Sequence, residues 1–172
     1  MFGLTQLGVL HTLVSLVAVV AAVVALVKHK EVSPRQRSGQ VYIVATIITC
    51  LTGFGIFQHG GFGPPHALDI MTLVTLAIAY AAGSGVFGHV SRRIEIIAYT
   101  TTVFFHSVPG VTESLTRLPP GAPIASSQED PMFPVIYGIF FVIFLVGVTL
   151  QVRWLGAHAA PLVADDHVRR AG

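Results

Sequence analysis

Five apolar segments alternate with short polar segments along this chain, and each is about as long as a helix that crosses a membrane. Spanning the hydrocarbon core takes about 20 helical residues. Lipid offers no partners to backbone N–H and C=O groups, so segments of this kind can only form helices. We therefore expect an all-α membrane protein, a bundle of five transmembrane helices within residues 1–155, followed by a polar tail, 156–172. The expected spans are 4–27, 39–57, 66–88, 94–116 and 134–152.

Charge supports this fold class and indicates an orientation. Only 10% of the residues are charged, against about 25% in soluble domains. Except for Arg117, the Lys and Arg residues fall on one side of the predicted membrane, which is the cytoplasmic side by the positive-inside rule. The N-terminus is then outside and the C-terminus cytoplasmic. The basic residues serve as topology signals, so we expect a lipid bilayer as partner and no nucleic acid.

The fourth apolar segment carries a stripe of polar side chains. Residues three or four apart share one face of a helix, and lipid would penalise a polar face, so it should point at other helices. Proline lacks an N–H and crowds the preceding turn, which predicts a broken or kinked helix at Pro109. The stripe consists of Glu95, Tyr99, Thr102, His106, Pro109, Glu113 and Arg117.

Polar side chains of three helices are expected at similar depths in the outer half of the bilayer. His11 and His106 lie deepest, and His66, Asp69 and Glu113 lie nearer the surface. Imidazoles and carboxylates are ligands for Zn, Fe or Cu. His11 and His106 are also the one deep pair for a b-type haem. The same residues would suit a proton relay or a quinone site. Their spacing matches no established metal motif.

Each of these residues also has a structural explanation. His11 could bond a neighbouring Thr or Tyr, Glu113 could pair with Arg117 four residues on, and Asp69 could cap its helix. Glu95 is expected to pair with Arg92 and Arg93. The single Cys50 is expected to be a buried thiol, because it cannot form an intrachain disulfide. The first span has no basic leader or clear cleavage site and is expected to stay as an anchor.

Residues of about the first half of the chain resemble a known family. They are a His-containing first span, the Arg37 to Tyr42 segment RSGQVY, the phrase GFGPPHALDIMTLVTL from Gly61 and the turn from His89 to Arg93. This pattern, over about residues 6–93, is similar to bacterial integral membrane proteins of the domain of unknown function 2306 type. His11, Gly39 and His66 match recurring positions, while Arg35 and Asp69 replace the usual His and Ser. The resemblance implies a helical bundle in a bacterial cytoplasmic (inner) membrane and no particular activity.

Three functions remain open after the sequence is read. The first is a His and carboxylate site that binds a metal ion, haem or quinone and is redox-active, with His11, His66, Asp69, His106 and Glu113 as candidate ligands. The second is a non-catalytic accessory subunit of a larger membrane complex, because the last span carries no ionisable group and could pack on a partner. The third is a small proton-coupled transporter that acts as a homo-oligomer. Whether the protein is an enzyme is left open.

Overall fold

The computed structural model describes residues 5–56 and 61–170, with side chains up to residue 157. About 79% of the chain is helical, and the described residues contain no strand. A short 3₁₀ helix, η1 (Gly88–Val90), precedes α4. The helices are α1 (Gln6–His29), α2 (Arg37–Gly53), α3 (Pro64–Gly83), α4 (Ser91–Arg117) and α5 (Met132–Arg170).

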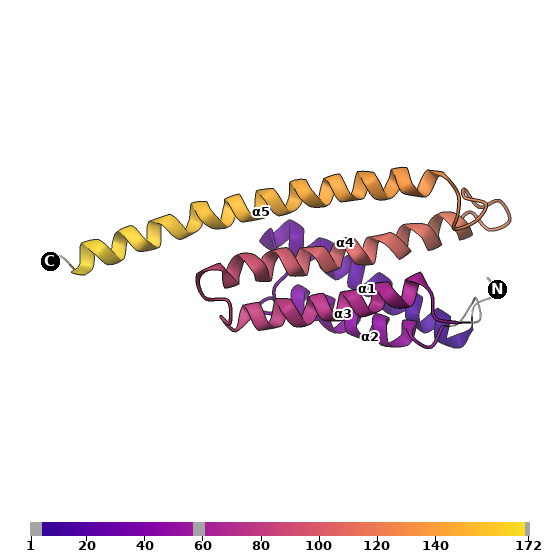
Figure 1. Ribbon diagram of the computed structural model, residues 1–172, viewed down its shortest axis with the longest axis horizontal. Helices are drawn as coiled ribbons and strands as arrows, with labels where there is room; N and C mark the ends of the chain where they lie inside the picture. Colours follow the sequence, from indigo (N-terminus) through magenta and orange to yellow (C-terminus); the bar gives the residue numbers. More distant parts are fainter. Residues whose placement is uncertain (1–4, 57–60, 171–172) are drawn as a thin grey trace.

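Helices α1 to α4 lie side by side as a bundle, and α5 runs along α4 (Figure 1). Successive helices run in opposite directions. We call the end that holds the loops 30–36 and 84–90 the basic end, because Lys30, Arg35 and the nearby Arg92 and Arg93 lie there. The other end holds the start of α1 and α3, the end of α4 and the loop 118–131. The two ends carry different sets of polar residues, described below.

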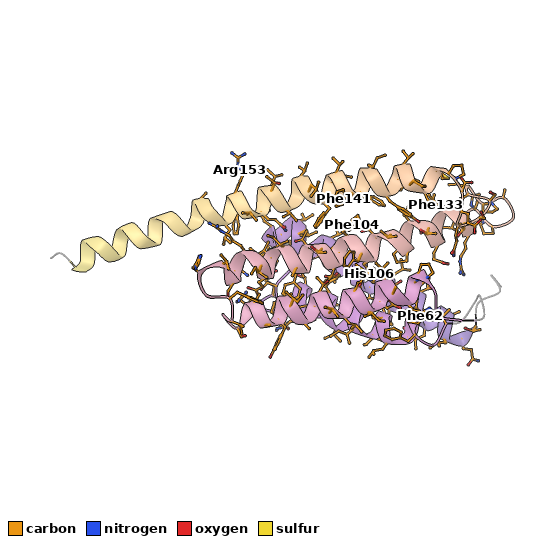
Figure 2. The ribbon with its side chains drawn as sticks, in the orientation of Figure 1. Phe62, Phe104, His106, Phe133, Phe141 and Arg153 are labelled. Atoms are coloured by element: carbon orange, nitrogen blue, oxygen red, sulfur yellow. The ribbon has the colours of Figure 1, made fainter. Side chains whose placement is uncertain are left out.

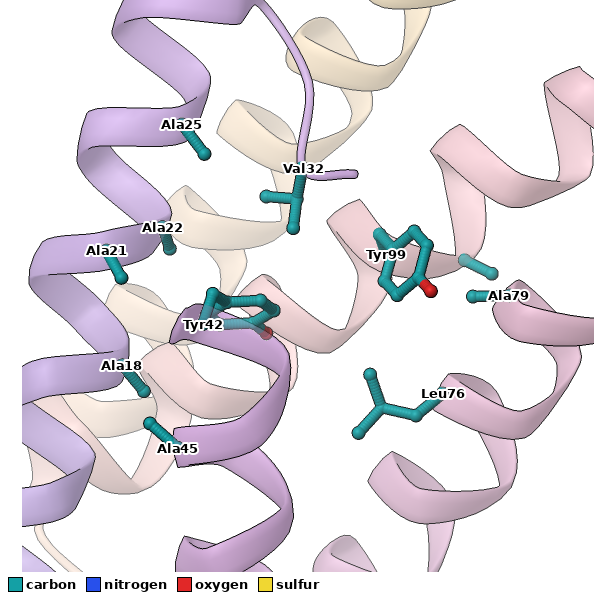
Figure 3. Close-up of a cluster of buried hydrophobic side chains, with 11 residues drawn as sticks. Ala18, Ala21, Ala22, Ala25, Val32, Tyr42, Ala45, Leu76, Ala79 and Tyr99 are labelled. Carbon is teal, nitrogen blue, oxygen red and sulfur yellow. The ribbon is translucent and has the colours of Figure 1, made fainter. Parts of the chain in front are cut away.

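Small side chains allow α1 to approach its neighbours closely. Ala18, Ala22 and Ala25 are almost completely buried along one face of α1. Alanine at helix contacts lets backbones approach, which favours packing between helices that lipid alone would not drive together. Tyr42 and Ala45 of α2 meet this face (Figure 3). The same cluster continues to α3 and α4 through Leu76, Ala79 and Tyr99.

Three helices are long and apolar enough to cross a membrane: α1, α3 and the part of α5 up to Ala157. The other two are α2, which has 17 residues, and α4, which carries the polar stripe. Within the chain, 22% of the apolar window of α1 and 28% of that of α3 is buried, but only 6% of that of α5. The helix α5 is therefore the least covered of the three.

The helix α4 runs without a break through Pro109 to Arg117. Of the two predicted outcomes at this position, the break is wrong, and the kink stays a prediction. Proline removes a single hydrogen-bond donor from the helix, and packing by neighbouring helices commonly holds such a membrane helix together. Here α3 and α5 both pack on α4. Glu113 therefore lies on the same continuous helix as Glu95 and His106.

The last helix is longer than the sequence predicts. The expected span ended at residue 152, with a separate polar tail from 156, but the backbone of α5 stays helical to Arg170. Figure 1 shows α5 projecting past the other helices at the basic end. The backbone of the predicted tail is thus a continuation of the helix.

Candidate functional site

The two deep histidines both bond across helix contacts. Nδ1 of His11 lies 3.1 Å from Oγ1 of Thr52 on α2. Nε2 of His106 lies 3.3 Å from the backbone oxygen of Ser15, one turn beyond His11 on α1. The two imidazoles are near enough to interact electrostatically. The structure therefore brings His11 and His106 together as the sequence predicts, and the expected bond from His11 to a threonine is confirmed.

Glu113 lies near the two histidines but has closer partners. Its carboxylate pairs with Arg117 one turn further along α4, which confirms the ion pair expected from their spacing. It also accepts a hydrogen bond from Nε2 of Gln128, at 3.3 Å. Its charge still interacts with His11. Glu113 thus stands at the edge of the histidine pair as a carboxylate held by an arginine.

His66 lies in the first turn of α3, apart from the other two histidines. Its Nδ1 accepts a hydrogen bond from the backbone N–H of Gly63, at 3.2 Å. Its ring stacks against Phe62, with centroids 5.2 Å apart, and against Phe54, at 6.5 Å. The N-cap of α3 is therefore Gly63, with His66 as the residue that bonds back to it, and the prediction that Asp69 caps this helix is wrong.

Asp69 faces α2. Its carboxyl fills the space beside Gly53, where an added Cβ would overlap Oδ2 of Asp69. The thiol of Cys50, three residues earlier on α2, lies near enough to interact with this carboxyl. Cys50 is buried and reduced, as expected. Asp69 and Cys50 form a polar pair between α2 and α3.

The five predicted ligands are thus divided among three places. His11, His106 and Glu113 lie between α1 and the end of α4, Asp69 lies between α2 and α3, and His66 lies at the start of α3. Within residues 5–56 and 61–157, no three His, Cys, Asp or Glu side chains come close enough to hold a metal ion. A haem between His11 and His106 would require α1 and α4 to separate, because His106 contacts the α1 backbone directly.

A network of four charged side chains lies at the basic end. Arg35 donates two hydrogen bonds to Glu95, at 2.8 and 3.2 Å. Arg92 donates to the other side of Glu95, at 2.8 Å, and to both oxygens of Glu31, at 2.6 Å. The side chain of Glu95 is 1% exposed and that of Arg35 53%. The network joins the loop after α1 to the start of α4.

Two glycines make room for this network. A Cβ on Gly39 would overlap the backbone oxygen of Ser33 in the loop that carries Arg35. A Cβ on Gly83 would lie 3.1 Å from Oε1 of Glu95. The pairing of Glu95 with Arg92 is confirmed, but the second arginine is Arg35 and not the predicted Arg93. The signal available in the sequence for Glu31 and Arg35 is weak: Glu31 is the single acidic residue in a basic loop, and nothing in its spacing indicates the distant partner Arg92.

Hydrogen bonds connect α4 to the helices around it. The hydroxyl of Tyr42 on α2 donates to Oγ1 of Thr102, at 2.8 Å. Thr112 contacts the hydroxyl of Tyr137 on α5, at 2.6 Å. Thr100 donates to Gln151, also on α5, at 2.8 Å. The polar stripe therefore joins α4 to α2 through Thr102, and two threonines outside the stripe join α4 to α5.

Comparison with known proteins adds no relative. No family model, curated protein or solved structure matches this chain.

Proposed function

We propose that all five helices cross the cytoplasmic membrane of a bacterium, with the N-terminus outside. The chain has three helices that could each span a membrane, and α2 and α4 are packed between and beside them. The loops and helix termini at the basic end carry all the Lys and Arg residues before α5 except Arg117, which favours a cytoplasmic location for that end. The resemblance of residues 6–93 to the domain of unknown function 2306 type agrees with this proposal.

Within that membrane, we propose that the protein is a non-catalytic accessory subunit that packs on a larger complex through α5. The main support is the exposure of α5: only 6% of its most apolar stretch is buried by the rest of the chain. Helix α5 packs on α4, where Phe104 stacks with Phe144 at 5.3 Å and contacts Phe141 (Figure 2). Its other faces are free to meet the helices of a partner.

The polar contacts of the bundle support the same proposal. The imidazoles of His11 and His106 and the carboxylates of Glu31, Glu95 and Glu113 all have partners within the chain. Polar bonds between membrane helices fix their register and contribute about 1 kcal/mol each. A rigid bundle that carries one exposed helix is what an accessory subunit requires.

Photo-crosslinking from α5 tests this proposal. A photoreactive amino acid replaces Ile143 of α5, which is 60% exposed, and the control replaces Val20 of α1, which is 63% exposed. Neither position is covered by the rest of the chain, and their exposures are nearly equal. A difference in crosslinking therefore cannot come from exposure alone. If the protein is an accessory subunit, the probe at position 143 should crosslink to one other protein in native membranes, and the probe at position 20 should not. The crosslinked protein should also co-purify with this chain in a fixed ratio. Crosslinks to lipid alone, or only to a second copy of this chain, would contradict it.

The histidine pair favours a second function, a quinone or proton site in the outer half of the bilayer that is redox-active. The observation behind it is the proximity of His11, His106 and Glu113, which interact across α1 and α4. An imidazole can donate to a quinone oxygen or pass a proton. This function predicts that purified protein binds a ubiquinone analogue, and that His106→Gln weakens binding at least tenfold while His66→Gln does not. Equal binding by both variants would reject it.

The metal and haem forms of this function have a separate test. Elemental analysis and an absorption spectrum of protein purified from native membranes measure bound metal and haem directly. A stoichiometric metal or a haem band that disappears in His106→Gln would support a centre at that residue. Protein that contains neither metal nor haem would rule out those two cofactors and leave a quinone site or a proton site as the second function.

A further inference from the structure

Asp69 differs from the other carboxylates inside the helical bundle. Glu31 and Glu95 pair with arginines at the basic end, and Glu113 pairs with Arg117. Within the described part of the chain, Asp69 forms no ion pair with a basic side chain. It lies on α3, which is one of the three candidate membrane spans. Five residues after Pro64, it is about 7–8 Å along that helix from its start.

The surroundings of Asp69 offer little to stabilise a negative charge. The carboxyl sits against the backbone of Gly53 on α2, and the α2 side chain that interacts with it is the Cys50 thiol, which is a weak donor. On its own helix, the nearest titratable group is His66, whose Nδ1 is turned to the Gly63 backbone. The next residues of α3, Ile70 and Met71, are exposed and apolar. An unpaired charged carboxylate costs about 2.5–3.5 kcal/mol at the bilayer centre and less towards the surface, where it is still unfavourable in apolar surroundings.

We propose that Asp69 is held as a neutral carboxylic acid between α2 and α3, and that it is an exchangeable proton-binding site and a modification site for apolar carbodiimides. The proposal concerns α2 and α3 and does not depend on a partner of α5. It requires a proton on the carboxyl, which the absence of an ion-pair partner among the described residues favours, and access to the carboxyl, which the partial exposure of Asp69 allows.

The modification is an addition that needs no other reactant. The carboxyl proton passes to one carbodiimide nitrogen, a carboxyl oxygen bonds to the central carbon, and one C=N bond becomes single. The resulting O-acylisourea rearranges to a stable N-acylurea as the acyl group moves from oxygen to nitrogen. No atom leaves, so the protein gains the mass of one carbodiimide. Ion-paired carboxylates lack the proton that starts this reaction.

Labelling of the full-length protein tests the site. The protein is placed in nanodiscs of phosphatidylethanolamine and phosphatidylglycerol, treated with dicyclohexylcarbodiimide and analysed by peptide mass spectrometry. We expect one adduct, on Asp69, whose yield falls as the pH is raised. Asp69→Asn should remove the adduct and unfold at nearly the wild-type temperature, because the amide replaces a neutral group of the same shape. An adduct on Glu95 or Glu113 with none on Asp69 would overturn the proposal.

Two substitutions of Cys50 provide a matched pair. Cys50→Ser places a stronger hydrogen-bond donor beside the carboxyl, which favours the ionised form, so labelling should fall at a given pH. Cys50→Ala removes the donor, so labelling should persist to higher pH than in the wild type. Equal pH profiles for the two variants, or labelling of Asp69 that does not change with pH, would show that the proton on Asp69 does not control the reaction.

Discussion

Glu95 and Glu113 lie on one helix and both pair with arginine, but they differ in burial. The side chain of Glu95 is 1% exposed and is shared by two arginines, whereas that of Glu113 is 41% exposed. Exposed ion pairs contribute about 0–1 kcal/mol. Removing one partner of a buried pair costs about 3–5 kcal/mol, because the remaining charge is left uncompensated.

We therefore expect Glu95→Gln to lower the free energy of unfolding by about 2–4 kcal/mol, a value reduced from the buried range because Arg35 is half exposed. Glu113→Gln, the control on the same helix, should cost less than about 1 kcal/mol. Denaturation in detergent micelles measures both. Similar costs for the two variants would mean that the network at the basic end contributes no more than a surface ion pair.

The glycine at position 39 offers a second test at the residue scale. Gly39→Ala places a methyl group onto the backbone oxygen of Ser33, and such overpacking costs about 1–3 kcal/mol. Gly138→Ala on α5 is the control, because nothing lies within 4 Å of the added Cβ and alanine favours the helix by up to about 1 kcal/mol. The temperature of thermal unfolding should fall in Gly39→Ala and rise slightly in Gly138→Ala. A neutral Gly39→Ala would show that the loop 30–36 can shift freely.

Local pairs could be predicted from the sequence, and distant pairs could not. Glu113 and Arg117 are four residues apart on one helix, so helical spacing alone brings them together. Arg35 and Glu95 are 60 residues apart, and their contact depends on how two helices and a loop pack. For the same reason, depth in the membrane predicted that His11 and His106 are neighbours, but it could not show that His66 and Asp69 face other groups.

Among the elements, α5 is the one that depends most on a few polar contacts. Gln151 is buried and bridges two elements: it accepts from Thr100 of α4 and donates to the backbone oxygen of Lys30 after α1, each at 2.8 Å. Thr149, two residues earlier, is exposed and bonds only within its own helix, to the oxygen of Leu145. The two residues thus form a matched pair for a test of how α5 is held.

We expect Gln151→Leu to loosen α5, since it removes two hydrogen bonds that contribute about 1 kcal/mol each. Amide hydrogen exchange should quicken in α5 and in the loop 118–131, while α1 and α2 stay protected. Thr149→Val should leave the exchange pattern unchanged. Exchange that quickens throughout the chain in Gln151→Leu would mean that α5 and the bundle unfold as one unit.

The order of the helices followed from the lengths of the apolar segments, and the sequence predicts their bounds to within a few residues, except at the end of α3 and in α5. Two features depended on packing instead. Pro109 does not interrupt α4, because a proline removes a single donor from a helix whose other hydrogen bonds and packing can hold it together. The backbone of α5 continues past the predicted span to Arg170, since polarity marks the limit of a membrane span and not the limit of a helix.

At the scale of the whole molecule, the proposed orientation can be measured with single cysteines in a Cys50→Ala background. Ser84 lies in an exposed loop at the basic end and Ser127 in an exposed loop at the other end. A membrane-impermeant maleimide added to spheroplasts should label Ser127→Cys, and Ser84→Cys only after the membrane is opened. The reverse pattern would place the N-terminus inside.

The central claim is that this bundle is a membrane subunit whose least covered helix packs on another protein. Native mass spectrometry of the protein extracted from its own membranes in nanodiscs measures this most directly. The account predicts a heteromeric assembly of fixed stoichiometry, which loses this chain when Ile139 and Ile143, both exposed on α5, are replaced by bulky tryptophan. The protein released as a monomer, or as an oligomer of this chain alone, would contradict the claim.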